Sequence, residues 1–193
     1  MLVGKGEKLS PSDYHIKEKQ VYQCRIFSVY EGEYQLPDGR VNRQTRVDHR
    51  PCVTVVPVDD QGRIILIRQY RYAVNRELME IPAGSMDKGS EKPEACARRE
   101  LAEETGFGAT NWVQLFEGYL LPGYCNEYMY FFLALGLYPS PLPKDEDEYI
   151  EIVETDFTDA DAMIADGRIR DCKTALAIRL TQDLLRRDDL LRT

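Results

Sequence analysis

Two strongly apolar segments between residues 52 and 71 set the strictest limit on how this chain folds. The first reads CVTVVPVDD and the second reads RIILIRQYR, and they join across DDQG. Two such runs around a short turn predict a β-hairpin. We therefore expect a pair of core strands at about residues 52 to 71.

Strand and helix patterns follow one another through the rest of the chain. Further strands are expected at 78–81, 111–120, 127–137 and 149–157. A helix is expected at about 91 to 105, because Pro93 suits a first helical turn and Gly106 suits the left-handed residue that ends a helix. Helical spacing in ADAMIADG and KTALAIRLTQDLLRR predicts a short and a longer C-terminal helix. The fold class is α+β.

The first 50 residues predict a separate, β-rich arm. Strands are expected at Tyr22 to Tyr30 and at Val41 to Asp48, with LPDGR at 36 to 40 as the turn between them. A hairpin of this size has little core of its own, so we expect it to lie against another surface, such as a second copy of the chain. The expected domains are residues 1–50, for dimerisation, and residues 51–193.

Composition limits the partners of the protein. The formal net charge of -8 disfavours nucleic acid, since phosphate binding relies on lysine and arginine. An anionic substrate would need a metal ion or a few placed arginines. The two histidines, His15 and His49, are far apart in sequence, which argues against a histidine metal site or a catalytic triad.

The cysteines and the apolar runs bear on location. Five cysteines are scattered singly, which is typical of reduced thiols rather than of a disulfide scaffold. There is no signal-peptide pattern, and the longest mostly apolar run, Tyr128 to Tyr138, is far shorter than the roughly 20 residues of a membrane span. A cytoplasmic protein without a membrane partner is expected.

The expected helix at 91 to 105 carries an unusual density of acids. Glu100, Glu103 and Glu104 are spaced so that residues three and four apart share one face. Three carboxylates there suit a hard cation such as Mg²⁺ or Mn²⁺, which prefers oxygen ligands. The alternative is a charged face in contact with water, and the acids by themselves favour that alternative.

The residues around these acids resemble the signature of the Nudix hydrolase family, G-x5-E-x7-R-E-U-x-E-E-x-G-U, where U is a bulky apolar residue. The matching positions are Arg99, Glu100, Leu101, Glu103, Glu104, Gly106 and Phe107. Seven residues separate Glu91 from Arg99, as in the family, but six rather than five separate Gly84 from Glu91. The extra residue lengthens the loop SMDKGS and leaves the helix register unchanged.

The resemblance implies a Nudix fold, a mixed sheet between helices, over about residues 50 to 193. It also implies hydrolysis of a nucleoside diphosphate linked to another group, with Mg²⁺ or Mn²⁺ between the acidic protein and the anionic pyrophosphate. The implied metal ligands are the Ala83 carbonyl and the carboxylates of Glu100, Glu103 and Glu104. Arg99 and Glu103 are implied in the catalytic signature.

Three further stretches resemble the branch of the family that cleaves ADP-ribose and other nucleoside diphosphate sugars. Pro122 lies 16 residues beyond Gly106, IRQYR matches a Q-x-R element that ends in Arg71, and GRIRDCKTALA matches a helix start. The branch implies a small nucleotide sugar as substrate, and it makes Arg71 a candidate for clamping the phosphates or the terminal sugar. GDP-mannose is the closest alternative substrate.

The same branch suggests roles for residues outside the signature. Glu148 in the acidic loop DEDEYIEI is the candidate catalytic base, with Glu146 as substitute, although the loop also fits a plain solvated turn. Related enzymes form dimers through N-terminal arms, so Arg43 or Arg46 could reach a nucleotide across a homodimer. Glu80 could accept hydrogen bonds from the substrate.

Two other function classes stay open at this stage. One is a non-catalytic regulator that binds a nucleotide sugar, although such proteins usually lose signature glutamates. The other is a Nudix enzyme for capped RNA or dinucleoside polyphosphates, which the lack of a basic groove in the sequence and the position of Pro122 disfavour.

Overall fold

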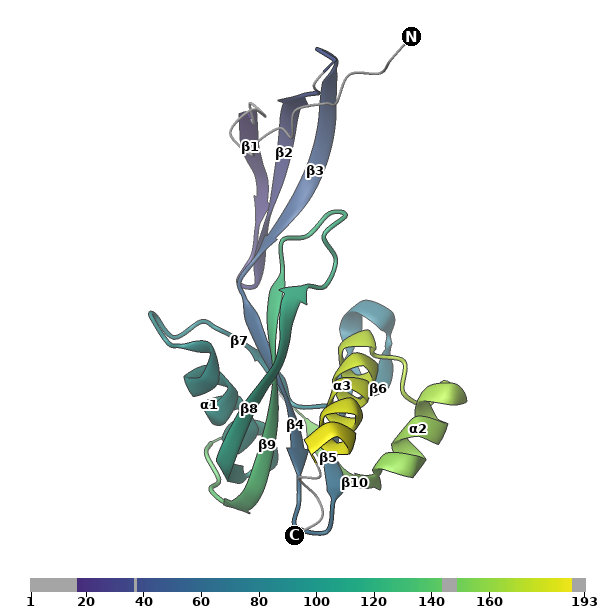
Figure 1. Ribbon diagram of the computed structural model, residues 1–193. Helices are drawn as coiled ribbons and strands as arrows, with labels where there is room; N and C mark the ends of the chain where they lie inside the picture. The colour runs from purple at the N-terminus through teal and green to yellow at the C-terminus, as the bar shows by residue number, and fades with distance from the viewer. Residues whose placement is uncertain (1–16, 37, 144–148, 189–193) are drawn as a thin grey trace. The chain divides into compact units, whose positions relative to one another are not determined.

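A computed structural model describes residues 17–36, 38–143 and 149–188 of the chain (Figure 1). The chain divides into two compact units, one formed by residues up to His49 together with Leu121–Glu127, the other by Arg50–Leu120 together with residues from Tyr128 onward. The elements in chain order are β1 (Lys17–Gln23), β2 (Phe27–Gln35), β3 (Val41–His49), β4 (Cys52–Val58), β5 (Arg63–Arg71), η2 (Tyr72–Val74), β6 (Arg76–Glu80), β7 (Ala83–Ser85), α1 (Pro93–Thr105), β8 (Phe107–Tyr119), β9 (Tyr128–Pro139), β10 (Ile150–Asp156), α2 (Phe157–Ala165) and α3 (Cys172–Asp188).

The second unit is built on a mixed sheet with the strand order β10-β5-β4-β9-β8. Strand β6 adds to β5, and β7 adds to β4. The β4 and β9 strands run parallel, whereas the other pairs are antiparallel. The expected hairpin at 52 to 71 is confirmed, and so is the α+β class. The short strand β7 was not expected, because IPAG carries no strand pattern.

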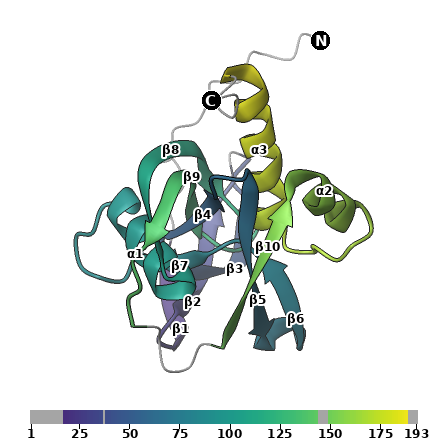
Figure 2. The same ribbon diagram turned by 90° about the horizontal axis from the view of Figure 1, so that it is seen from below.

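Helices cover both faces of this sheet (Figures 1 and 2). On one face, Cys96, Ala97 and Leu101 of α1 pack with Val53 and Val55 of β4. On the other face, Ala160 of α2 and Ile178 of α3 pack against apolar side chains of β4, β5 and β9, which include Val56, Leu66 and Phe131. The alternating residues of β4 therefore belong to two separate cores, which is why its sequence is apolar except for the buried Thr54.

The α1 helix begins and ends at residues that the sequence indicated. Pro93 is in its first turn. Gly106 ends it with a left-handed φ of 77°, and its N–H donates to the carbonyl of Ala102 at 3.0 Å. The predicted helix at 91 to 105 is therefore confirmed, with its start two residues later.

The first unit is a three-stranded antiparallel sheet in the order β1-β2-β3. The single strand expected at Tyr22 to Tyr30 is wrong, because β1 ends at Gln23 and β2 begins at Phe27. Most of β1 was not expected, since KEKQVYQ shows no apolar alternation and all seven of its residues are exposed. At the turn before β3, Gly39 has a φ of 88°, whereas Pro37 of the predicted turn is outside the described residues. No residue in 17–36 or 38–49 is buried, so this sheet has no core of its own.

The segment Leu121–Glu127, which contains Pro122, is attached to β3. The N–H of Val47 donates to the carbonyl of Tyr124 at 2.7 Å, and the N–H of Asn126 donates to the carbonyl of Val47 at 3.2 Å. The side chain of Asn126 also donates to Asp48 at 2.7 Å and accepts from the backbone of His49 at 2.7 Å. These bonds make the segment part of the first unit, although β8 and β9 flank it in sequence.

Among the helices described here, none combines the length and the apolar composition that crossing a membrane would require.

Replacing Gly106 by Ala should lower the free energy of unfolding by roughly 1–2 kcal/mol, because a Cβ disfavours the left-handed backbone that ends α1. Gly106→Asn should lose less, since asparagine tolerates this conformation. Urea unfolding of both variants measures the difference. Equal losses in the two variants would contradict the conformational explanation.

Candidate functional site

The acids of α1 gather around the guanidinium of Arg99. One nitrogen, Nη1, donates to Glu100 Oε1 at 2.6 Å and to Glu103 Oε2 at 2.7 Å. The other side of the guanidinium donates to both oxygens of Glu91, at 3.3 and 3.1 Å. The Arg99 side chain is 14% exposed. A protein cation therefore lies among these carboxylates, and the acidic face is not simply a solvated one.

Arg99 also connects α1 to the strand β7. Its Nη2 donates to the carbonyl of Ser85 at 3.4 Å, and the buried thiol of Cys96 donates to the same carbonyl at 3.6 Å. Burial opposes the charge of Arg99, but hydrogen bonds to Glu91 and Glu103 and the charge of Glu100 outweigh it and raise its pKa. Arg99 is cationic at any pH at which the protein is folded.

The longer loop before α1 leaves Glu91 in the acidic cluster. Glu91 is 15% exposed and forms a two-point ion pair with Arg99, so the extra residue in SMDKGS does not move this carboxylate away from the cluster. Sequence reasoning found its position but not its partner. The sequence signal for this ion pair was the opposite charge of Arg99, eight residues after Glu91.

Gly84 is required by the close approach of Glu100. A Cβ at residue 84 would lie 1.9 Å from the carboxyl carbon of Glu100 and 2.1 and 2.3 Å from its oxygens. Any other residue would displace the Glu100 carboxylate. The glycine is therefore explained by steric contact between β7 and α1, rather than by a turn.

Glu104 reaches β7 from the next turn of the helix. Its Oε2 accepts a hydrogen bond from the N–H of Ala83 at 3.0 Å, and the residue is only 2% exposed. The structure thus brings Ala83 next to Glu104 and brings Gly84 next to Glu100. Four residues expected at the metal site, Ala83, Glu100, Glu103 and Glu104, lie along this contact between α1 and β7.

The donor set of this contact fits a hard divalent cation. It consists of carboxylate oxygens, and the side chains of Glu100 and Glu104 are largely enclosed. Because Gly84 has no side chain, the Glu100 carboxylate lies directly against β7. Mg²⁺ and Mn²⁺ prefer oxygen ligands of this kind.

A second polar cluster involves Arg71 and Glu80. Arg71 donates from Nε and Nη2 to the two oxygens of Glu80 at 2.7 and 2.9 Å, a two-point ion pair. Lys173 of α3 also donates to Glu80 Oε2. Glu80 is 1% exposed, so both oxygens are occupied by cations of the chain itself. This pairing supports Arg71, and the expected role of Glu80 as an acceptor for a substrate stays a prediction.

The start of α3 completes this cluster. Asp171 Oδ2 accepts hydrogen bonds from Lys173 Nζ at 2.9 Å and from the N–H of Thr174 at 2.9 Å. The hydroxyl of Thr174 in turn accepts from the N–H of Ile81 at 3.0 Å. The stretch D-x-K-T, noted in the sequence only as a resemblance, therefore attaches α3 to the end of β6.

Burial opposes ionisation of Glu80, but hydrogen bonds and charge from Arg71 and Lys173 outweigh it and lower its pKa to about 2. The pKa of Arg71 is raised, chiefly by its hydrogen bonds to Glu80 and further by the charges of Glu80, Glu104 and Asp171. Arg71 therefore lies within electrostatic reach of Glu104 on α1.

The two arginines expected at the nucleotide belong to the first unit. Arg43 is 83% exposed and pairs with Glu33 at 2.6 Å. Arg46 makes a two-point pair with Glu18 at 2.7 and 2.9 Å, pairs with Asp48 at 2.6 Å, and stacks over the ring of Tyr30 at 4.5 Å. Arg43 thus has an accessible cationic head, whereas Arg46 is held within its own sheet.

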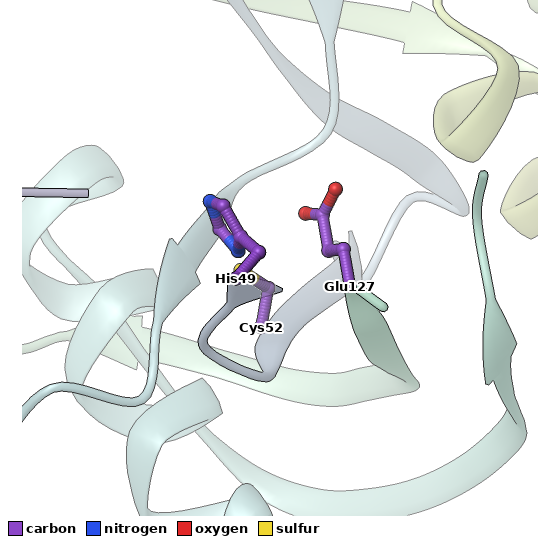
Figure 3. A group of neighbouring side chains, drawn as sticks. All are labelled: His49, Cys52 and Glu127. Carbon is purple, nitrogen blue, oxygen red and sulfur yellow. The ribbon is translucent and has the colours of Figure 1, made fainter. Parts of the chain in front are cut away.

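Glu146 and Glu148, the candidate bases, lie outside the described residues, as does His15. Figure 3 labels the neighbouring side chains of His49, Cys52 and Glu127. His49 and Glu127 belong to the first unit, whereas Cys52 is the first residue of β4 in the second unit. Because these three residues are divided between the units, we assign no metal site to them.

Replacing Glu80 by Gln should lower the free energy of unfolding near pH 7 by roughly 3 kcal/mol or more, because Arg71 and Lys173 lose their counter-ion. The pKa of Glu80 is lowered from 4.5 to about 2, so its contribution is complete above pH 4.5 and is lost as the pH falls toward 2. The difference between the two proteins in urea unfolding should shrink over that range.

Glu77→Gln, an exposed change on the same strand, is the matched control and should shift stability by less than about 0.5 kcal/mol. A Glu80→Gln penalty that is as large near pH 2 as near pH 7 would contradict the ion-pair explanation.

Known proteins resemble this chain over most of its length. It is 36% identical over 169 residues to the ADP-ribose pyrophosphatase of Bacillus subtilis (strain 168), covering 86% of this chain and 91% of that protein. It is 45% identical over 132 residues to the GDP-mannose pyrophosphatase of Yersinia pestis (strain Pestoides F), covering 63% and 65% of the two chains. A crystal structure of an ADP compounds hydrolase aligns with a TM-score of 0.83 and 27% identity, over 94% of this chain and 97% of that one.

The family model of the NUDIX domain matches residues 48–173, which include β7, α1 and the start of α3. The match spans the mixed sheet, the acidic helix and the glycine that faces it. The chain therefore belongs to the Nudix hydrolase family.

Proposed function

We propose that this Nudix enzyme hydrolyses the pyrophosphate bond of ADP-ribose or a related nucleoside diphosphate sugar, giving a nucleoside monophosphate and a sugar phosphate. The observation that carries this proposal is the contact between α1 and β7, where Arg99 holds Glu100 and Glu103 beside the buried Glu104. The names of the two curated relatives support a nucleotide sugar as the substrate class.

The carboxylates of Glu100, Glu103 and Glu104 and the backbone of Ala83 are the residues proposed to hold a divalent cation, with Mg²⁺ favoured and Mn²⁺ as the alternative. When bound, the cation supplies positive charge against the phosphoryl oxygens and acidifies water. The acidic chain needs such a charge, since its net charge of -8 would otherwise repel a pyrophosphate.

Arg99 is proposed to act by positioning these ligands. Its side chain is 14% exposed and is engaged by Glu91, Glu100 and Glu103. These bonds fix the carboxylate orientations against their mutual repulsion.

Arg71 is proposed to bind the pyrophosphate. Its side chain is 37% exposed, and the ion pair with Glu80 fixes its direction. A fixed, planar cation can form two parallel hydrogen bonds with phosphate oxygens.

Glu148, with Glu146 as substitute, is proposed as the base that takes a proton from the attacking water. Comparing Glu148→Gln with Glu146→Gln at saturating substrate identifies the base, because the kcat of the correct variant should fall by about 10²-fold or more. Equal kcat values in both variants and the unaltered protein would remove this loop from the mechanism.

The first unit is proposed to form a homodimer through its uncovered sheet and to bring Arg43 or Arg46 toward a nucleotide base. Its lack of any buried residue in 17–36 and 38–49 supports a partner surface. Sedimentation of the full chain over a range of concentrations tests the dimer, and a monomer throughout would reject it.

A cytoplasmic location is also proposed, because all five cysteines are free thiols. Fractionation of the cells that make the protein tests this.

The substrate itself is tested by incubating the protein with ADP-ribose, GDP-mannose and other nucleotide sugars in the presence of Mg²⁺, and measuring the nucleoside monophosphate released. Cleavage of ADP-ribose with the highest kcat/KM is the expected result. Preference for GDP-mannose would select the alternative substrate, which the 45% identical relative favours. Binding without turnover of any compound would instead indicate a non-catalytic regulator.

Glu104→Gln should reduce kcat by about 10³-fold or more, because the change removes a buried ligand charge while keeping the shape and the hydrogen bond from Ala83. Glu94→Gln is the matched control, since Glu94 is on the same helix, is 52% exposed in its side chain and pairs only with Arg98 among the ion pairs observed in the described part of the chain. Its kcat should stay within about twofold. Unchanged turnover in Glu104→Gln would show that α1 is not the metal site.

A further inference from the structure

Gln69 on β5 carries a buried acceptor without a partner among the described residues. The residue is 8% exposed, and within 17–36, 38–143 and 149–188 its buried side-chain oxygen Oε1 has no hydrogen-bond partner. A buried polar atom without a partner costs free energy comparable to a lost hydrogen bond. Because this oxygen is closed to solvent, a ligand can supply the missing donor only when the terminal amide turns and exchanges the places of its oxygen and nitrogen.

The register of the strands places Gln69 on the same face as the Arg71 and Glu80 pair. Gln69 and Arg71 are two residues apart on β5 and so point to the same side of the sheet. In the antiparallel pairing of β5 with β6, Gln69 is opposite Leu78, and Ile67 is opposite Glu80. Gln69 therefore lies along the face that Arg71 crosses to reach Glu80.

The neighbouring residues on β5 face the other way. Arg68 pairs with Glu151 of β10 at 3.1 Å, and Tyr70 donates its hydroxyl to Asn75 at 2.8 Å. Both are substantially exposed. The strand thus separates a solvated side from the side that carries the unpaired amide.

The chemistry of the unpaired atom selects the part of the substrate that it can bind. An amide oxygen accepts hydrogen bonds, so its ligand must present an N–H or O–H group. A pyrophosphate diester at neutral pH presents only acceptors, and it suits Arg71. The hydroxyl groups of the sugar next to the pyrophosphate are donors.

We propose that Gln69 is a specificity-determining residue, which accepts a hydrogen bond from a hydroxyl group of the sugar attached to the pyrophosphate. Arg71, two residues along the strand, binds the adjacent phosphate. This inference rests on the proposed function, because it assigns Gln69 to the sugar of a nucleoside diphosphate sugar. It makes β5 the strand that distinguishes nucleotide sugars from other pyrophosphates.

Gln69→Leu tests the assignment with three compounds: ADP-ribose, GDP-mannose and P2-methyl ADP, in which a methyl ester replaces the sugar. The variant should lose about tenfold or more in kcat/KM for the preferred nucleotide sugar, through a higher KM, and should stay within about twofold for the methyl ester. Calorimetric titration with the same compounds gives the corresponding changes in Kd. The Tm should be unchanged or higher, since the variant removes an unpaired buried atom.

Arg68→Gln is the matched control on the opposite side of the same strand, and it should leave the values for all three compounds within about twofold. An equal loss for the sugars and the methyl ester in Gln69→Leu would place Gln69 at the phosphates or in the structure of the site, and would overturn the inference. Unchanged values for every compound would assign the amide to a buried water and would overturn it as well.

Failure of the proposed function is distinguishable, because it appears as no cleavage of either nucleotide sugar by the unaltered protein. Calorimetric titration then tests the role of Gln69 in binding, independently of cleavage. Weaker binding of ADP-ribose, but not of the methyl ester, to Gln69→Leu would support the assignment. Equal Kd values, or no binding to either protein, would reject it.

Discussion

The guanidinium of Arg99 is the interaction on which the rest of the candidate site depends. Glu91, Glu100 and Glu103 would repel one another if they were packed this closely without a cation. Arg99 compensates their charge from within the helix and also binds the carbonyl of Ser85 on β7. One side chain therefore fixes the orientation of the carboxylates and the distance between α1 and the sheet.

That short distance explains the glycine of the motif. With Arg99 holding α1 against β7, the Glu100 carboxylate occupies the place where a Cβ of residue 84 would be. Glu104 makes the same approach one turn later and accepts the N–H of Ala83. The glycine and the three glutamates are separated in sequence by a loop, yet they form one contact, so an additional residue in the loop is tolerated.

The ion pair of Arg71 and Glu80 likewise compensates a buried charge, here between β5 and β6. A buried carboxylate is costly unless its charge and lone pairs are satisfied, and Arg71 and Lys173 satisfy both. As a result, the Arg71 guanidinium on β5 has a defined direction, and Asp171 and Thr174 at the start of α3 support the pair. Among the described residues Gln69, beside it, has no partner for its side-chain oxygen, and this difference from Glu80 is the basis for proposing that Gln69 binds a ligand.

The sequence by itself determined the elements that depend on local rules. Pro93 and Gly106 bounded the helix, the apolar runs at 52 to 71 gave the core hairpin, and the signature residues indicated the family, because short-range spacing encodes all three. The exposed strand β1 and the three-residue strand β7 could not be predicted, since neither has an apolar pattern and both form through pairing with other strands. Tertiary structure alone decided that Glu80 binds Arg71 and Lys173, that Glu91 stays with Arg99, and that 121–127 joins β3. It also decided that no described residue pairs with the side-chain oxygen of Gln69. Each of these depends on partners brought together by folding, and the spacing of residues along the chain does not specify which charges and hydrogen-bonding groups will meet.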